Sequence, residues 1–140
     1  MKNYALLFCL LFCFAAAGCS GNKKLSGKVM FDDGTPAPNG TVTFLSKNNS
    51  FMSRGEIQSD GSYKLSSAKT NDGIPPGEYK VYVSGISEMP EGPPSAMLLP
   101  ILLCDPKYTD PGTSGITCTI PAPGNRFDIT IERRKTGRKQ

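Results

Sequence analysis

The 140-residue chain has no histidine, no tryptophan and only five cysteines. Without histidine it lacks the usual general base of hydrolases, the central member of a serine triad and the commonest zinc ligand. Three of the cysteines lie within residues 1–19, so the two that follow cannot form a tetrathiolate site. These absences weigh against catalysis, and we predict no catalytic residue, cofactor-binding residue or metal site.

The net charge of +4 is modest and unevenly distributed. Much of the positive excess lies in residues 133–140, with the sequence RRKTGRKQ, and the preceding domain is slightly acidic. Binding to nucleic acid needs a positive face that follows the phosphate backbone. We therefore expect no nucleic-acid partner. Residues 134–140 are interpreted as a disordered basic tail, with attraction to anionic envelope polymers as the alternative.

Residues 1–18 are typical of a secretory signal peptide. Lys2 precedes an uncharged apolar run from Tyr4 to Ala17, and Gly18 follows it. As a helix this run would span roughly 21 Å, which is short of the roughly 30 Å hydrocarbon core of a bilayer. The pattern predicts a removable leader rather than a transmembrane helix.

Cys19 directly follows this leader. The segment Ala16-Ala17-Gly18-Cys19 resembles the bacterial lipobox, although Ala16 stands where leucine is usual. The resemblance implies that the Cys19 thiol receives a diacylglycerol and that the new amino terminus receives an acyl chain such as palmitate. Residues 19–24 would then form a polar tether to the domain. Cleavage near Ala17 with simple secretion is the alternative.

Lipidation at Cys19 predicts an exported protein anchored in the cell envelope. Each buried CH₂ contributes roughly 0.8 kcal/mol, so two or three acyl chains hold a protein on a bilayer where one chain does not. By the sorting preference of such lipoproteins, Ser20 after the cysteine favours the outer membrane in a cell that has one.

Cys104 and Cys118 remain in the expected mature chain. Export places them in an oxidising compartment, where cysteine pairs often form disulfides. Cys118 alternates with Ile116 and Ile120, so its side chain is expected to face the core. Two alternatives stay open: a Cys104–Cys118 disulfide, worth roughly 3 kcal/mol in the loop-entropy model, or two separately buried thiols.

Residues 25–133 form short apolar–polar alternations separated by turns rich in glycine and proline. Val42 and Phe44 are expected to point into the core, and Asp60-Gly61 predicts a tight hairpin turn. Helical periodicity is not evident, so the fold class is predicted to be all-β, with one β-sandwich of about seven strands. Strands are expected at residues 24–31, 41–44, 54–58, 63–65, 78–83, 116–120 and 127–131.

A series of motifs resembles a known domain. LSGKVMFDDGTP begins at Leu25, GTVTF at Gly40, SDGSY at Ser59 and IPPGEYKVYV at Ile74. In this order they resemble the carboxypeptidase regulatory-like β-sandwich, which is transthyretin-like and immunoglobulin-like. The segment DPKYTDPGTSGIT, from Asp105, resembles a variant in small exported lipoproteins of planctomycete-type bacteria.

The resemblance covers nearly all of residues 25–131. It implies that Tyr63, Tyr79 and Val81 pack between two sheets. It also implies an accessory domain without peptidase chemistry, and a fold of this kind does not by itself define a function.

Besides the basic tail, two features are candidates for binding, and three aspartates are candidate ligands of a cation. Asp32, Asp33 and Asp72 are the best carboxylates for an oxygen-ligated cation, but Asp-Gly pairs are more often turns. The loop with Tyr108 and Asp110 either presents the tyrosine to a ligand or packs it on its own strands. The apolar run from Ala96 to Cys104, broken by Pro100, is interpreted as a buried strand with its lead-in; a patch for a partner is the alternative.

The sequence thus predicts a lipid-anchored, non-enzymatic envelope lipoprotein that acts as a structural or interaction module. A carbohydrate- or peptide-binding module of a surface assembly is the alternative, and an accessory protein of an exported hydrolase is a third hypothesis. The expected partners are the membrane, through the lipid, and an envelope protein or polysaccharide. A row of exposed aromatic side chains on one sheet face would favour sugar binding.

Overall fold

The computed structural model describes residues 21–65, 73–93, 95 and 97–135. The expected leader (residues 1–18), Cys19, Asp72 and residues 136–140 of the basic tail lie outside the described residues. Within the described ranges, no helix has the length and apolar character needed to cross a membrane.

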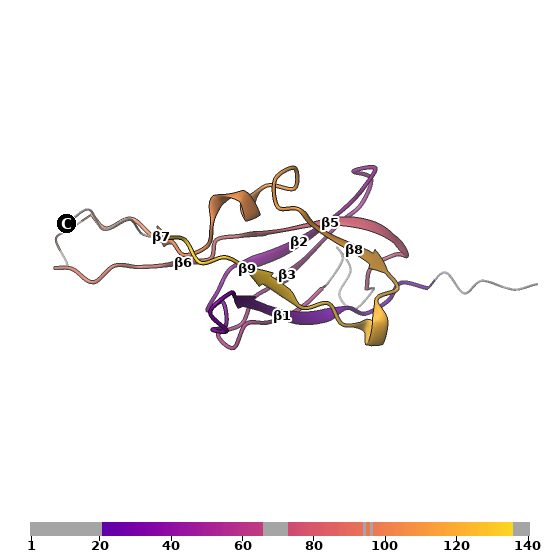
Figure 1. Cartoon of the computed structure of the whole chain (residues 1–140), viewed down its shortest axis with the longest axis horizontal. Helices are drawn as coiled ribbons and strands as arrows, with labels where there is room; N and C mark the ends of the chain where they lie inside the picture. Colours follow the sequence, from indigo (N-terminus) through magenta and orange to yellow (C-terminus); the bar gives the residue numbers. More distant parts are fainter. Residues whose placement is uncertain (1–20, 66–72, 94, 96, 136–140) are drawn as a thin grey trace, which may run out of the picture.

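Two β-sheets pack face to face as a sandwich (Figure 1). One sheet has the strand order β4-β1-β9 and the other β3-β2-β5-β8. The predicted all-β sandwich is therefore confirmed. The strands are β4 (Ser62–Lys64), β1 (Ser26–Phe31) and β9 (Ile129–Ile131) in the first sheet, and β3 (Met52–Glu56), β2 (Thr41–Ser46), β5 (Gly77–Ser84) and β8 (Ile116–Ile120) in the second.

A two-stranded ribbon extends from one end of the sandwich (Figure 1). It consists of β6 (Ser87–Glu88) and β7 (Ile101–Leu102), which pair antiparallel. Among the described residues, helical structure is confined to two short 3-10 turns, η1 (Pro106–Thr109) and η2 (Pro123–Asn125).

Strand β5 is central in the larger sheet and pairs antiparallel on both sides. Its alternation buries Tyr79, Val81 and Val83 and exposes Lys80, as the period of two in a strand requires. Val81 lies opposite Phe44 of β2, and Tyr79 lies opposite Cys118 of β8. The inward orientation predicted for Cys118 is confirmed by its burial.

Strand β1 lies between two strands that run in different directions. It pairs antiparallel with β4, where Gly27 faces Tyr63, and parallel with β9, where Val29 faces Ile129. The parallel pair joins the first strand in the described chain to the last one. Lys28 N–H, for example, donates to the side chain of Asp128, one hundred residues later.

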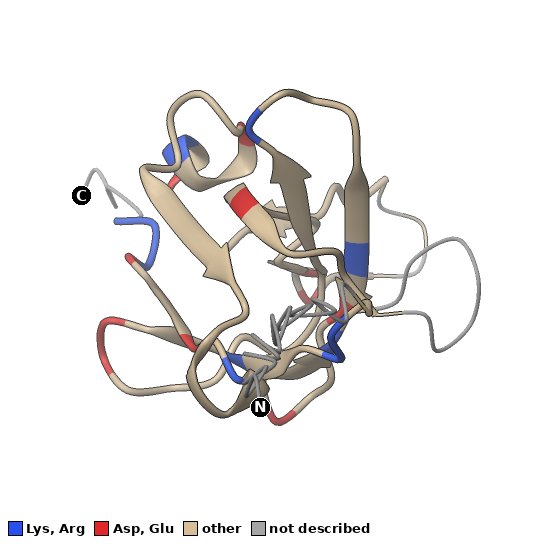
Figure 2. Ribbon diagram, turned by 90° about the vertical axis from the view of Figure 1, so that its right-hand side faces the viewer, with Lys and Arg blue, Asp and Glu red and all other residues tan. Residues whose placement is uncertain are grey.

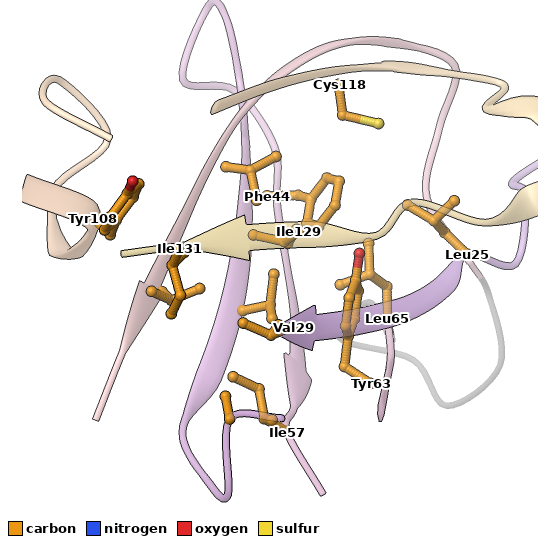
Figure 3. Close-up of a cluster of buried hydrophobic side chains, with 14 of the residues drawn as sticks. Leu25, Val29, Phe44, Ile57, Tyr63, Leu65, Tyr108, Cys118, Ile129 and Ile131 are labelled. Atoms are coloured by element: carbon orange, nitrogen blue, oxygen red, sulfur yellow. The ribbon is translucent and has the colours of Figure 1, made fainter. Parts of the chain in front are cut away.

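Phe44 forms the centre of the core between the sheets (Figure 3). Its ring centroid lies 6.3 Å from that of Tyr63, 6.2 Å from that of Tyr79 and 6.0 Å from that of Phe127. The Tyr63 hydroxyl donates to the Phe127 carbonyl at 2.5 Å, so this buried aromatic keeps a polar partner. The structure confirms that Tyr63 and Tyr79 pack between the sheets.

The turn predicted at Asp60-Gly61 forms, but it does not make a hairpin within one sheet. Gly61 has a φ of +80° and its N–H donates to the Gln58 carbonyl at 2.8 Å. The strand before the turn, β3, pairs with β2, whereas the strand after it, β4, pairs with β1. The turn therefore carries the chain from one sheet to the other.

The chain after β9 is fastened to the turn that follows β1. Arg133 Nε lies 2.9 Å from Asp33 Oδ2, and the guanidinium carbon lies 4.0 Å from the centroid of the Phe31 ring. Thr35 donates to Asp33 through both its hydroxyl and its N–H. These bonds from Thr35, assisted by Arg133, lower the pKa of Asp33 to about 2. Asp33 thus has structural partners within the domain.

Gly27 is the position where an added methyl group should do most damage. A Cβ there would lie 1.8 Å from the Phe127 carbonyl oxygen and 2.9 Å from Tyr63 Cε1. We expect Gly27→Ala to lower the free energy of unfolding by about 1–3 kcal/mol or to prevent folding. Chemical denaturation measures this, with Gly21→Ala as the control because nothing lies within 4 Å of its Cβ. Equal stability of the two variants would contradict the packing at Gly27.

Asp33 should contribute to stability in a pH-dependent way. Because the pKa is lowered by folding from 3.8 to about 2, the carboxylate stabilises the fold above pH 3.8, and this contribution is lost as the pH falls toward 2. Asp33→Asn is therefore expected to have a lower melting temperature than the unmodified chain at pH 7, with a gap that narrows between pH 4 and pH 2. Thermal denaturation checks this, and Glu56→Gln on β3 controls for loss of an exposed charge. A gap that does not depend on pH would refute it.

Candidate functional site

The apolar run from Ala96 to Cys104 is not a buried strand, and that interpretation is wrong. Among the residues of this run that the structure describes, only Ile101 and Leu102 form a strand, and they pair with β6 rather than with either main sheet. Met97 is 95% exposed and Leu99 is 74% exposed, whereas Cys104 at the end of the run is fully buried. The run therefore leaves the domain as an exposed segment and returns to the core at Cys104.

Residues 85–103, apart from 94 and 96, make up the feature that we call the arm. In Figure 1 the arm extends from the end of the sandwich opposite to the start of the described chain at residue 21. Besides Met97 and Leu99, it exposes 63% of Met89 and 40% of Ile101. Four of the five large hydrophobic residues that are exposed in the described chain lie on this one segment.

The base of the arm is fixed to the sandwich by backbone and side-chain hydrogen bonds. Asn39 donates to the Ser87 carbonyl at 2.7 Å and accepts from the Ser87 N–H at 3.0 Å. Leu103 N–H donates to the Ile86 carbonyl at 2.9 Å, and Arg134 N–H donates to the Leu103 carbonyl at 2.7 Å. Ile86 is itself fully buried. The arm is thus held at its base by two other parts of the chain, at Asn39 and at Arg134, and by a hydrogen bond between its own two ends.

Prolines explain why so apolar a segment is not a core strand. Pro90, Pro93 and Pro100 lie in or beside it. A proline has no N–H for a β-ladder, so it is confined to edges, strand starts and loops. This signal was present in the sequence, but the hydrophobicity of the run argued in the opposite direction.

Tyr108 packs on its own domain rather than facing a ligand. It is buried in the core cluster, and its hydroxyl donates to Glu132 at 3.4 Å. Lys107 lies beside it, with its Nζ 2.7 Å from Glu132 and 4.9 Å from the tyrosine ring centroid. Asp110 accepts from the Gly112 N–H and shapes the following turn. Of the two interpretations of this loop, packing on its own strands is the one observed.

The other candidate carboxylates are also engaged within the fold. Asp32 accepts from the Arg133 N–H at 3.2 Å, and Asp60 accepts from the Ser62 hydroxyl and N–H. The described residues contain no group of three or more cysteine or acidic side chains arranged to hold a metal ion. Asp60 therefore acts as a turn residue, and Asp32, like Asp33, fastens the turn after β1 to the chain after β9.

Cys104 and Cys118 are both buried, and each is a free thiol in the structure. Cys104 forms a backbone bridge with Arg133, whereas Cys118 lies on β8 opposite Tyr79. Burial raises the pKa of both thiols, and that of Cys118 reaches about 11. A raised pKa suppresses the thiolate, so neither cysteine has the character of a nucleophile.

Two shallow hollows lie on the larger sheet, on either side of the Lys47–Glu78 ion pair. One has a volume of about 210 Å³ and is bordered by Thr117 and Thr119, and the other has a volume of about 450 Å³ and is bordered by Phe51. The Tyr79 hydroxyl beside them donates to the Pro75 carbonyl at 2.9 Å, and burial raises its pKa. These hollows contain no activated nucleophile or base.

Comparisons with known proteins give one structural likeness. No protein-family model matches the chain. A search of curated proteins likewise finds no match. Among solved structures, the chain is similar to the major pilin subunit of Bacillus cereus, with 15% sequence identity and a TM-score of 0.48. The likeness covers 82% of this chain, but only 30% of the pilin subunit.

The two thiols should be reduced and protected in the folded protein. We expect an alkylating reagent to modify Cys104 and Cys118 slowly under native conditions, because both are buried and have raised pKa values. After denaturation without reductant, both thiols should react rapidly with the reagent. Peptide mass analysis distinguishes the cases. Two thiols that stay unmodified after denaturation and react only once reductant is added would instead demonstrate a disulfide.

Proposed function

We propose that the protein is a non-catalytic module of the cell envelope that uses the arm to contact a partner. The observation that carries this proposal is the exposed apolar arm at the end of the domain away from residue 21. Exposed apolar side chains gathered on one projecting segment are characteristic of interaction sites. A lipid on Cys19 would place the opposite end of the domain at the membrane and direct the arm outward.

The proposed partner of the arm is a protein rather than a polysaccharide. Sugar-binding faces use exposed aromatic rings, but the side chains exposed on the arm are methionine, leucine and isoleucine. Methionine is flexible and polarisable, which suits it to apolar protein surfaces of varied shape. The eight aromatic residues of the described chain are all buried or half-buried, and five of them belong to the core.

The charge distribution supports the proposal that nucleic acid is not a partner. Figure 2 shows the positions of lysine and arginine interspersed with those of aspartate and glutamate along the ribbon. Several of these charges form ion pairs within the domain, such as Arg126–Asp128 and Lys107–Glu132. A mixed surface of this kind lacks the continuous positive stripe that a phosphate backbone requires.

Anchoring, export and family membership belong to the same proposal. Cys19 is the proposed lipidation site and Ser20 favours the outer membrane, while the ordered motifs from Leu25 to Ile74 support a carboxypeptidase regulatory-like sandwich. A role beside an exported hydrolase is a less favoured variant of the same surface function. None of these roles requires chemistry from the domain itself.

The arm is tested by photo-crosslinking in intact cells. A photoreactive residue at position 97 is expected to give a discrete adduct with another protein, and Leu99→Ser in the same chain should weaken that adduct. Position 52 is the matched control, because Met52 is also exposed, at 45%, but lies on β3. The arm variants should unfold within about 0.5 kcal/mol of the unmodified chain. Identical adducts from positions 52 and 97, or none from 97, would exclude the arm as the contact.

The anchor is tested separately by replacing Cys19 with Ser and separating membranes from soluble material. We expect the unmodified chain to remain with membranes and the variant to lose this association, because no acyl chain can then be attached. Cys104→Ser serves as the matched control for loss of a cysteine. Membrane retention of Cys19→Ser equal to that of the unmodified chain would overturn the lipoprotein hypothesis without affecting the arm.

A further inference from the structure

Strand β8 forms one edge of the larger sheet and has an open hydrogen-bonding side. The Lys47 N–H donates to the Glu78 carbonyl, so the backbone N–H and carbonyl of Glu78 on β5 point toward β2. The backbone groups of successive residues in a strand point to opposite sides. Those of Tyr79 and Val81 therefore point toward β8, where they bond with Cys118 and Ile116. The backbone groups of the intervening residues of β8 point away from β5.

These outward groups belong to Thr117 and Thr119. In the part of the chain that the structure describes, no backbone group bonds to the N–H or carbonyl of either threonine on this side. Their side chains are exposed on the outer face of the sheet, whereas Cys118 between them faces the core. Within the described chain, the edge therefore offers the N–H groups of both threonines and the carbonyl of Thr117 for pairing, while the Thr119 carbonyl accepts a long hydrogen bond from the Cys118 thiol at 3.9 Å.

The other sheet edges carry features that hinder strand addition. Strand β3 has Arg54 and Glu56, and β4 is three residues long and has Lys64. Strand β9 is also three residues long, and the Glu132 carbonyl beyond it accepts from the Asp105 N–H. Charges, short length and covered edges are the usual protections against edge pairing. Strand β8 is five residues long and has no charged residue.

The sequence of β8 is Ile-Thr-Cys-Thr-Ile, which reads the same in both directions. We propose that β8 is a self-association edge, through which two copies of this chain pair antiparallel about Cys118. In this register Thr117 lies opposite Thr119 of the second copy, and each such pair exchanges both of its N–H···O bonds. Ile116 lies opposite Ile120 of the second copy. Residues that face the core therefore lie opposite residues that face the core, and exposed residues lie opposite exposed residues.

The charged residues beside β8 do not oppose this pairing. Lys80 lies next to Thr117, and Glu78 lies next to Thr119. Each row of side chains across the paired edge therefore contains four residues: Lys80 and Thr117 of one copy, then Thr119 and Glu78 of the second copy. The two ends of the row carry opposite charges. The strand itself brings no like charges together. The contact is isologous, as closed two-fold dimers require.

The size of the contact predicts that the pair is reversible. Joining five-residue strands buries less than the roughly 1,200–2,000 Å² of a stable interface. The dimer should consequently form where copies are concentrated, as on one membrane or at high protein concentration. The test must capture the pair in place rather than rely on its survival in dilute solution.

Disulfide mapping in cells tests the register directly. Thr117→Cys and Thr119→Cys are introduced into separately tagged copies of the full chain, which are expressed together and treated with copper–phenanthroline as oxidant. Facing residues of such a pair have Cα atoms about 5.5 Å apart, within the range of a disulfide. We expect a mixed dimer, resolved without reductant, at a level several-fold above that from two unmodified copies.

Thr130→Cys on β9 is the matched control, because Thr130 is an exposed threonine on an edge strand of the other sheet. Its pairing with Thr119→Cys should stay at the level of random collision. Thermal denaturation confirms that all three variants fold. The proposal would be overturned if the mixed dimer of Thr117→Cys and Thr119→Cys were absent, or if it were no more abundant than the dimer formed with Thr130→Cys. The outcome does not depend on the arm.

Discussion

Phe44 contacts three other aromatic rings, and two of these contacts, with Tyr63 and Phe127, join the larger sheet to the smaller one. Phe44 projects from β2 of the larger sheet, Tyr63 projects from β4 of the smaller one, and Phe127 leads into β9. Offset and edge-on ring pairs contribute about 0.5–1.5 kcal/mol each beyond their buried area. The Tyr63 hydroxyl also bonds to the Phe127 carbonyl, and Gly27 gives this carbonyl room. The register of β1, β4 and β9 depends on this crowded point.

Local patterns predicted the strands of this domain well because alternation is a property of a few neighbouring residues. The eight-residue β5 and the Cys118 strand lie where they were expected, with the expected faces buried. The pattern does not contain the identity of the partner strand. The Asp60-Gly61 turn formed with the expected backbone geometry, yet it joins different sheets, because β3 and β4 each find a better partner elsewhere.

The arm was the part of the candidate site for which the favoured sequence interpretation, a buried strand, was wrong and its alternative, an exposed patch, was right. Apolar composition predicts burial only if the backbone can also join a sheet, and the prolines around residues 90–100 prevent that. Ile86 near one end of the arm and Cys104 just beyond the other end are fully buried, and Leu102 and Leu103 pack partly against the core. Met89, Met97, Leu99 and Ile101 are exposed because the nearby sandwich is already filled by its own strands. The exposure of this surface therefore depends on the missing N–H groups of the prolines as much as on the apolar side chains.

The parallel pairing of β1 with β9 constrains the order in which the domain can form. A ribosome produces β1 first and completes β9 about one hundred residues later, so β1 has only β4 as a sheet partner for most of synthesis. Contacts between segments so far apart in sequence form late, because a long loop must close first. The smaller sheet therefore stays incomplete on the growing chain. Any cellular process that needs an unfolded polypeptide can act until the last strand emerges.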